Sequence, residues 1–259
     1  MLQTSKLETD KGEAAIVVNK DGSSPFVLVC EHAGLELPEA LGDMGMSPAE
    51  LKSHVAWDPG AAAVAELMAV ELNGPLIKQR YSRLVYDCNR PPSSGEAMRA
   101  VSEETRIPAN ADLSREEKQW RICNIYDAFH DCVAQHLDKC DAPVLVTVHS
   151  FTPVYHGQRR RVDVGILHDD DSRLADAVLA VAEFDDGVVV LRNEPYGPQD
   201  GVTHTLKLHG EKRQILNVMI EIKSELIDDE KNQQHYAHQL AKALKKAVDV
   251  LCVADSKQS

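Results

Sequence analysis

Short apolar runs alternate with longer amphipathic segments along most of the chain. Most of the short runs are continuously apolar and rich in β-branched residues, which is typical of strands covered on both faces of a sheet. They predict strands at residues 26–30, 75–79, 84–86, 144–148, 162–167, 188–191 and 216–222. The longer segments carry apolar residues at helical spacing. They predict helices at residues 59–72, 114–139, 172–183 and 229–251.

Two of the predicted helices have recognisable starts. Asp58 precedes Pro59, which suits an N-cap followed by proline at the first helical position, and Ser114 precedes an acidic first turn. The alternation of strands and helices predicts a three-layer α/β/α fold with a mostly parallel mixed central sheet. In such folds ligands collect beyond the carboxyl ends of the strands. We expect residues 1–259 to form a single domain, with residues 1–15 as a flexible N-terminal segment.

Composition narrows the class of protein. The 259 residues are 43% hydrophobic and 27% charged, which is ordinary for a globular protein with a real core. A net charge of -13 argues against a nucleic-acid partner, because phosphate binding needs a basic surface. No apolar stretch reaches the roughly 18–20 residues of a membrane span. The six cysteines include no CxxC pair, and the polar N-terminus does not resemble a signal peptide, so we expect a cytoplasmic protein.

Two of the predicted strands end on histidine. VLVCEH ends on His32, and VLVTVHS carries His149. If these strands are parallel neighbours, their ends meet at one edge of the sheet, and two imidazoles with a carboxylate are a ligand set that suits a catalytic zinc ion. The carboxylate could come from Glu31, Glu36 or Asp58. The alternative is that each histidine is only a hydrogen-bonded residue at a strand exit.

The segment YSRLVYDCNRPP gathers polar groups around a short apolar run. Arginine grips a carboxylate with two parallel hydrogen bonds, so Arg83, Asn89 and Arg90 are candidates for binding an acidic substrate. Pro91 and Pro92 stiffen the loop that follows. For Arg83 the alternative is an internal salt bridge, for instance with Asp87.

Glu221 interrupts the apolar run NVMIEIK. A carboxylate inside a buried strand is unfavourable unless it is paired, and burial raises its pKa, which suits a general base or acid. The alternative is that Glu221 faces solvent at the edge of a sheet. The chain contains no P-loop, GxGxxG or GxSxG, so no motif indicates nucleotide binding or a serine hydrolase.

Several segments together resemble the N-formylglutamate amidohydrolase family. They are EHAG, WDPGA, YSRLVYDCNRP, ETRIPAN, VTVHSFTP, RVDVGILHD, NEPYG, THTLKLHGE and VMIEIKSEL, in that order along the chain. The family is similar to zinc carboxypeptidases and aspartoacylases, which implies a phosphorylase/hydrolase-like α/β/α fold. Those enzymes use a histidine and an acid, then arginines, a second histidine and a glutamate base. The matching order here is His32, Asp58, Arg83, Asn89, Arg90, His149 and Glu221.

The resemblance implies a zinc-dependent amidohydrolase that acts on a small acidic N-acyl amino acid such as N-formyl-L-glutamate. Zn²⁺ would be held by His32, Asp58 and His149, with Glu221 as the catalytic base. One departure from the carboxypeptidase pattern concerns the acid. Leu35 stands where HxxE would place it, so Asp58 takes that role ahead of Glu31 or Glu36. The alternatives are an amidohydrolase of different acyl specificity and a binder of small acidic metabolites without catalytic activity.

Overall fold

A mixed sheet of seven strands runs through residues 14–255, the part of the chain that the structure, a computed structural model, describes. The order across the sheet is β1-β3-β2-β6-β11-β9-β10. Four neighbouring strands, β3, β2, β6 and β11, are parallel, whereas β1 and β9 run antiparallel to β3 and β11. The strands are β1 (Ala15–Val18), β2 (Phe26–Cys30), β3 (Leu76–Gln79), β6 (Val144–Phe151), β9 (Val164–Leu167), β10 (Val190–Arg192) and β11 (Leu216–Lys223).

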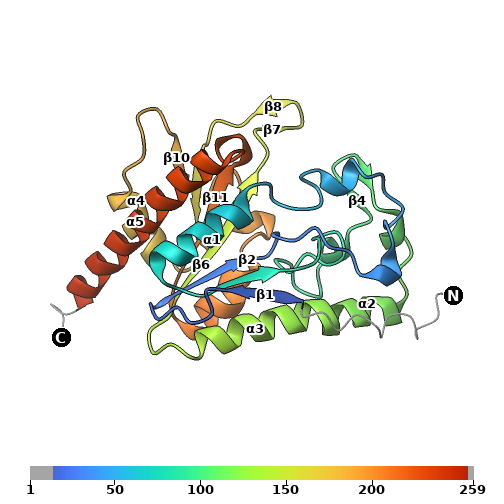
Figure 1. Cartoon of the computed structure of the whole chain (residues 1–259), viewed down its shortest axis with the longest axis horizontal. Coiled ribbons are helices and arrows are strands. Elements are labelled where there is room, and N and C mark those ends of the chain that lie inside the picture. Colours follow the sequence, from blue (N-terminus) through green and yellow to red (C-terminus); the bar gives the residue numbers. More distant parts are fainter. Residues whose placement is uncertain (1–13, 256–259) are drawn as a thin grey trace.

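Helices cover both faces of this sheet. Helices α1, α4 and α5 pack together on one face, and α3 lies along the other (Figure 1). The three-layer α/β/α fold with a mostly parallel mixed sheet is therefore confirmed. The helices are α1 (Ala61–Leu72), α2 (Arg115–Arg121), α3 (Ala128–Leu137), α4 (Arg173–Val181) and α5 (Glu230–Asp255). Two small hairpins, β4–β5 (Val101–Ser102, Thr105–Arg106) and β7–β8 (Val154–Tyr155, Gln158–Arg159), lie outside the sheet.

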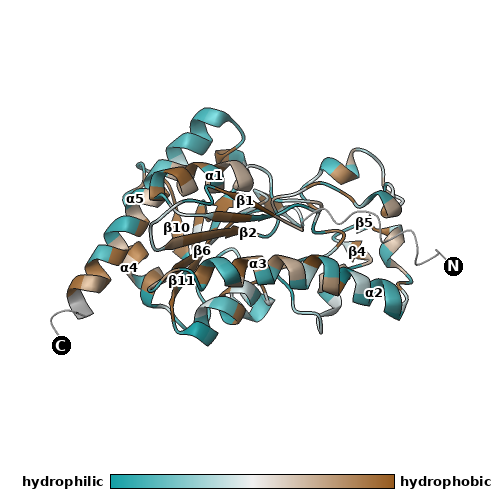
Figure 2. Cartoon of the chain, turned by 60° about the horizontal axis from the view of Figure 1, so that its bottom comes forward, coloured by the Kyte–Doolittle hydropathy of each residue, from teal (hydrophilic) through white to brown (hydrophobic). Residues whose placement is uncertain are grey.

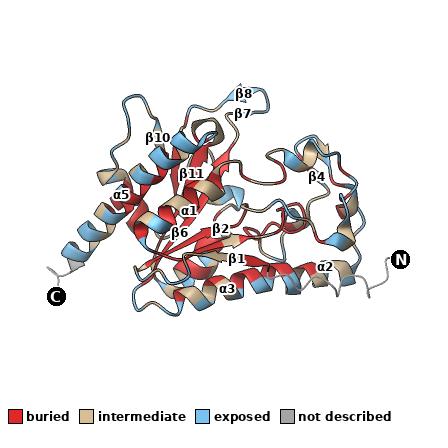
Figure 3. Ribbon diagram, in the orientation of Figure 1, coloured by how far each residue is buried: buried red, intermediate tan, exposed pale blue. Residues whose placement is uncertain are grey.

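The central strands are apolar on both faces because each face is buried. Leu28, Val146 and Ile220 belong to the core under α1, α4 and α5, whereas Val29 and Leu145 belong to the core on the side of α3. Figure 2 shows the resulting hydrophobic sheet between helices with polar outer surfaces, and Figure 3 shows that the strands are buried. This two-sided burial explains the continuous apolar runs in the sequence.

The predicted strand at residues 84–86 is wrong. These residues form a turn in which the Val85 amide donates to the Ser82 carbonyl, although Leu84, Val85 and Tyr86 are all buried. Side chains satisfy the three backbone carbonyls in place of a strand partner. The donors are Asn110 to Leu84, Arg121 to Val85 and Gln79 to Tyr86. The apolar run therefore indicates that these residues are buried, not that they pair with a strand. A buried carbonyl needs a hydrogen-bond donor, but a side chain can supply it as well as a neighbouring strand.

The predicted capping of the first helix by Asp58 is also wrong. Helix α1 begins at Ala61, and its N-cap is Gly60 with a φ of 80°. A Cβ on Gly60 would lie 2.5 Å from the Ile227 carbonyl oxygen, so only glycine fits this left-handed position. Asp58 therefore precedes the helix and keeps its carboxylate available for other contacts. At the second predicted start, Ser114 does cap α2, in a capping box with Glu117.

Other expectations hold with shifted boundaries. The predicted helix at 114–139 consists of α2 and α3 joined by a π-helical segment, Ile122–Asp127. Strand β1 was not predicted, and its first residue lies at the end of the segment expected to be flexible. Residues 1–13 of that segment lie outside the described residues.

No helix in the described part of the chain is both long enough and apolar enough to cross a membrane. All six cysteines are free thiols.

Candidate active site

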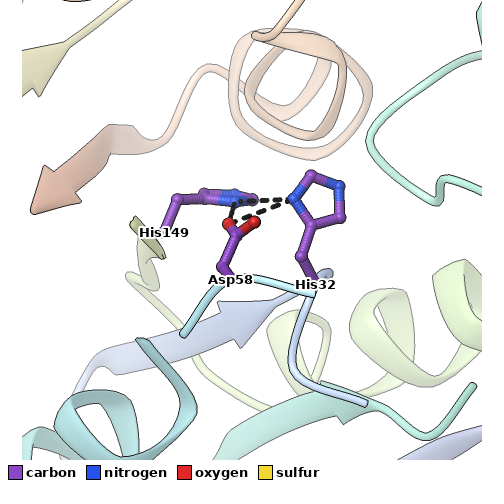
Figure 4. A group of neighbouring side chains, drawn as sticks. All are labelled: His32, Asp58 and His149. Atoms are coloured by element: carbon purple, nitrogen blue, oxygen red, sulfur yellow. Dashed lines mark hydrogen bonds and ion pairs between the residues drawn. The ribbon is translucent and has the colours of Figure 1, made fainter. Parts of the chain in front are cut away.

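The carboxyl ends of β2 and β6 bring two histidines together. The strands are parallel neighbours, with Val29 opposite Thr147 in the register. His32 lies just beyond the end of β2, and His149 lies near the end of β6. Figure 4 shows the two buried imidazoles directed at one point. The sequence predicted this meeting from the two strand ends alone.

Asp58 completes a compact group of three possible ligands. Its Oδ2 lies 2.9 Å from Nδ1 of His149 and 3.2 Å from Nδ1 of His32, and the two Nδ1 atoms lie 3.2 Å apart (Figure 4). Ligand atoms around a tetrahedral zinc ion lie about 3.3 Å apart when the bonds are about 2.0–2.1 Å long. The Asp58 amide also donates to the His32 carbonyl at 3.0 Å, which ties the loop before α1 to the end of β2. The spacing of these three atoms therefore suits a small divalent cation.

A second carboxylate lies behind each imidazole. Nε2 of His32 is 2.8 Å from Oδ1 of Asp87, and Nε2 of His149 is 3.1 Å from Oε2 of Glu31. Burial would raise the pKa of Glu31, but the adjacent His149 lowers it to about 2. His32 and Arg83 likewise outweigh burial and hold the pKa of Asp87 well below its usual range. Both carboxylates are therefore charged, and each favours a ring proton on the adjacent Nε2. Asp87 hydrogen-bonds to His32, whereas the Glu31–His149 contact has the geometry of an ion pair.

This arrangement leaves the two Nδ1 lone pairs directed at each other and at the Asp58 carboxylate. Three electron-rich atoms at this spacing repel each other unless a positive charge lies between them. Although burial opposes it, the Glu31 and Asp58 carboxylates hold the pKa of His149 well above its usual range. A proton can supply the missing charge, and so can a metal ion. Histidine ligands of metals commonly donate their second ring nitrogen to a carboxylate in this way.

The structure separates the three acids that the sequence left as alternatives. Asp58 faces the two Nδ1 atoms, Glu31 lies behind His149, and Glu36 is exposed and 3.8 Å from Arg80. Glu31 is fully buried, and neither of its oxygens has a hydrogen-bond partner of good geometry among residues 14–255. Its position fits a residue that orients His149 and not a direct ligand.

Arg83 lies between two carboxylates of the site. Its Nη1 donates to Asp58 Oδ1 at 3.2 Å and its Nη2 to Asp87 Oδ2 at 2.7 Å. The salt bridge with Asp87 is the alternative that the sequence left open. Arg83 thus holds one carboxylate that faces both histidines and another that orients His32. A direct contact of Arg83 with substrate stays a prediction.

Glu221 faces the same cluster from the next strand. It is in register with His149 on β6 and with Gly165 on β9, so its strand is central and the solvent-edge alternative is wrong. Burial, helped by the charge of Asp58 and opposed by His149, raises the pKa of Glu221 to about 7. Its Oε2 has no hydrogen-bond partner within the described residues. A carboxylate with these properties can exchange a proton near neutral pH.

Asn89 and Arg90 are fixed by the loop that contains Val202. Asn89 donates to the Val202 carbonyl and accepts from the Thr205 amide at 3.2 Å, so its amide group is largely used within the protein. Nη1 of Arg90 donates to the carbonyls of Asn89 and Gly201. Arg90 has no carboxylate within 4.0 Å among residues 14–255, and burial lowers the pKa of its guanidinium. Arg90 is thus a buried cation without a counter-ion in the described chain.

All seven predicted site residues line one cavity of about 640 Å³: His32, Asp58, Arg83, Asn89, Arg90, His149 and Glu221. Three residues with clear positions in this site were not singled out for it by the sequence. Asp87 was noted only as a possible partner of Arg83, and Tyr196 only within the family segment NEPYG. Arg160 belongs to the basic run Arg159-Arg160-Arg161, for which the sequence favours a solvated turn and leaves attraction of an anionic substrate as the alternative. His130, His204 and His209 do not line the cavity, and His130 and His209 hydrogen-bond to each other at 2.9 Å.

Comparisons with known proteins identify the family of the chain. A family model for N-formylglutamate amidohydrolase matches residues 24–227, which include all of the residues above. The chain belongs to the N-formylglutamate amidohydrolase family. Its members are named for hydrolysis of an amide, and the chain is accordingly a hydrolase of this family. No curated protein matches the chain.

Two solved structures show how widely the fold is shared. A gene product of Agrobacterium tumefaciens is 48% identical, with a TM-score of 0.90 over 93% of this chain and 97% of the other. An N-formylglutamate amidohydrolase from Ralstonia eutropha is 19% identical, with a TM-score of 0.65 over 92% of this chain and 98% of the other. At that lower identity the likeness concerns the fold alone.

Proposed function

We propose that the protein is a metal-dependent amidohydrolase that cleaves N-formyl-L-glutamate or a closely related N-acyl acidic amino acid. The observation that supports the metal is that Nδ1 of His32 and Nδ1 of His149 both lie within 3.2 Å of Asp58 Oδ2, while a carboxylate lies beside Nε2 of each ring. The ligands would be Nδ1 of His32, Nδ1 of His149 and Asp58, and Zn²⁺ is the ion that such a nitrogen and oxygen set suits best. A cation held there supplies Lewis-acid chemistry, which polarises the substrate carbonyl and makes water a stronger acid.

Glu221 is the proposed proton carrier. It accepts a proton from the attacking water as the water oxygen bonds to the amide carbon, and it delivers that proton to the nitrogen as the carbon–nitrogen bond breaks. A pKa raised to about 7 matches both halves of this task, because the group neither holds nor releases the proton too strongly. The products are the free acid of the acyl group and the free amino acid.

Arg90 is the proposed partner of the substrate α-carboxylate. It is buried at the cavity wall with no carboxylate within 4.0 Å among the described residues, whereas Arg83 already has two. The net charge of -13 makes diffuse attraction of an acidic substrate unfavourable, so binding must depend on local donors. Nη1 of Arg90 donates hydrogen bonds to the backbone carbonyls of Asn89 and Gly201, and these bonds hold the guanidinium in place for this role.

Replacing Arg90 with lysine keeps the charge but removes the planar fork. We expect Arg90→Lys to lower kcat/KM for the acidic substrate by about one to two orders of magnitude, equivalent to about 1.5–3 kcal/mol for charge-assisted hydrogen bonds. Metal content should not change. Arg99→Lys is the matched control, because Arg99 lines the same cavity but pairs with Glu96 at 2.9 Å. Steady-state kinetics equal to wild type in Arg90→Lys would show that Arg90 does not bind the carboxylate.

Removing the charge behind His149 should weaken metal binding without removing a ligand. We expect Glu31→Gln to lower metal affinity by about 10–100-fold, the usual effect of losing a partner of a metal-bound histidine. Glu36→Gln is the control, because Glu36 is exposed and makes only a 3.8 Å pair with Arg80. Competition with a chromophoric chelator measures both affinities. Equal affinity in the two variants, with Glu31→Gln still folded, would contradict the orienting role of Glu31.

A substrate panel tests the function as a whole. N-formyl, N-acetyl and N-succinyl derivatives of glutamate are incubated with the protein, with and without a chelator. The proposal predicts hydrolysis that the chelator stops and zinc restores, fastest with the N-formyl compound. A different order among the acyl groups would identify an amidohydrolase of other acyl specificity. Binding without hydrolysis, insensitive to chelator, would identify a binder of acidic metabolites.

A further inference from the structure

Six arginines line the active-site cavity, and four of them already have carboxylate partners. Arg83 pairs with Asp58 and Asp87, Arg99 with Glu96, Arg159 with Glu225 and Arg161 with Glu194. Arg90 and Arg160 have no carboxylate within 4.0 Å among residues 14–255. Two cations without counter-ions in one cavity are unusual in a protein with a net charge of -13. They indicate a ligand that brings two negative charges.

Arg160 is held by aromatic rings instead of by acids. Its guanidinium carbon lies 4.5 Å from the ring centre of Tyr196, 4.7 Å from that of Tyr155 and 5.4 Å from that of Phe151. Its backbone amide donates to the Pro153 carbonyl at 2.9 Å. Cation–π contacts of this kind fix the plane of the guanidinium but leave its edge free for hydrogen bonds. The ring contacts therefore orient Arg160 and leave donors at the edge of its guanidinium available.

One donor of this guanidinium lacks a partner. Nη1 of Arg160 is buried and has no hydrogen-bond acceptor within the described residues. A buried charged donor without an acceptor is unfavourable, so such atoms commonly face a ligand. The two neighbours in sequence differ sharply, because the side chains of Arg159 and Arg161 are 65% and 75% exposed and each lies 2.6 Å from a glutamate. The unpaired donor is thus a property of Arg160 and not of the whole basic turn.

Tyr196 connects Arg160 to the reacting groups. Its ring is in contact with Arg160, and its hydroxyl interacts with the same guanidinium. Burial raises the pKa of Tyr196 to about 12, with contributions from the charges of Glu221 and Asp58. Tyr196 is therefore near the proposed base and a proposed metal ligand on one side and Arg160 on the other. Glu221, Tyr196 and Arg160 line the same cavity, so one substrate can contact both Glu221 and Arg160.

We propose that Arg160 binds the side-chain carboxylate of an acidic amino-acid substrate, while Arg90 binds its α-carboxylate. This rests on the proposed function, and it makes Arg160 the residue that selects glutamate-like substrates over neutral ones. An arginine built to pair with a carboxylate rejects a neutral analogue, because the buried donors then lose their partner.

The test compares N-formyl-L-glutamate with its neutral isostere N-formyl-L-glutamine. We expect Arg160→Gln to lower kcat/KM for the first by about 10–100-fold, the range for losing a charge-assisted pair, and to change it little for the second. Arg159→Gln and Arg161→Gln are matched controls that remove the same charge from the same cavity wall, and exposed ion pairs of this kind contribute little. They should keep the wild-type preference for the acidic substrate. Equal losses on both substrates in Arg160→Gln would overturn the proposal.

Direct binding separates this inference from the proposed function. If the wild-type protein hydrolyses neither compound, the proposed function fails, and titration calorimetry with glutarate and butyrate decides the role of Arg160. Glutarate carries two carboxylates and butyrate one. Weaker binding of glutarate alone in Arg160→Gln supports the assignment. Unchanged glutarate binding overturns it.

Discussion

His149→Ala is expected to remove both bound metal and hydrolytic activity. His149 supplies one of only three proposed ligands, and its Nδ1 lies 2.9 Å from Asp58 and 3.2 Å from Nδ1 of His32. Without it the remaining pair cannot surround a cation. The effect should exceed the roughly 10–100-fold loss expected when only an outer partner of a ligand is removed. Activity should fall to background for the same reason.

The measurement is metal per chain after dialysis, followed by activity before and after zinc is added. Wild-type protein treated with a chelator should lose activity and regain it with zinc, whereas His149→Ala should not regain it. His54→Ala is the matched control, because His54 lines the same cavity but its Nε2 contacts only Glu103, at 2.9 Å. Full activity in His149→Ala, or in chelated wild type, would exclude metal-dependent hydrolysis at this site.

Glu221→Gln should lower kcat by about 10²–10⁴-fold, the contribution typical of a general acid or base. Glutamine keeps the shape of the side chain but cannot accept a proton from water. Because Glu221 is not a proposed ligand, metal content should stay at the wild-type level. Burial already disfavours the charged form of Glu221, so the neutral amide should fold at least as well.

Pre-steady-state and steady-state kinetics, together with metal content and Tm, separate these effects. Glu194→Gln serves as the control, since Glu194 lines the same cavity but pairs with Arg161 at 2.6 Å. A Glu221→Gln variant with normal metal content and wild-type kcat would assign the base to another residue. A variant that loses its metal would instead place Glu221 among the ligands.

The pattern of apolar residues was sufficient to predict the layers of the fold and the edge where the site lies. Continuous apolar runs require burial on both faces, and parallel strands bring their carboxyl ends to one edge. His32 and His149 were therefore expected to meet if their strands are parallel neighbours, as they are. Glu221 was a candidate because a carboxylate interrupts an apolar run, and its central strand excludes the solvent-edge alternative. The two expectations depend only on local periodicity.

Residue roles that depend on contacts between distant segments could not be predicted in this way. The sequence left Asp58, Glu31 and Glu36 as alternatives, and the fold places only Asp58 of these three within 3.2 Å of Nδ1 in both imidazoles. For Arg83, but not for Arg90, the sequence left open an internal salt bridge. Their roles differ because Asp58 and Asp87 lie beside Arg83, whereas only backbone carbonyls hold Arg90.

The sequence by itself determined the layers of the fold and most of its central strands, and it singled out His32, His149 and Glu221 as candidates, because the order of apolar and polar residues reflects burial on the two faces of the sheet. Tertiary structure alone decided that residues 84–86 form a turn, that Glu31 and Asp87 orient the imidazoles, and that Arg160 has no acid beside it. Hydrogen bonds and ion pairs between segments far apart in the chain depend on distances of a few ångströms, and no local pattern of residues encodes those distances.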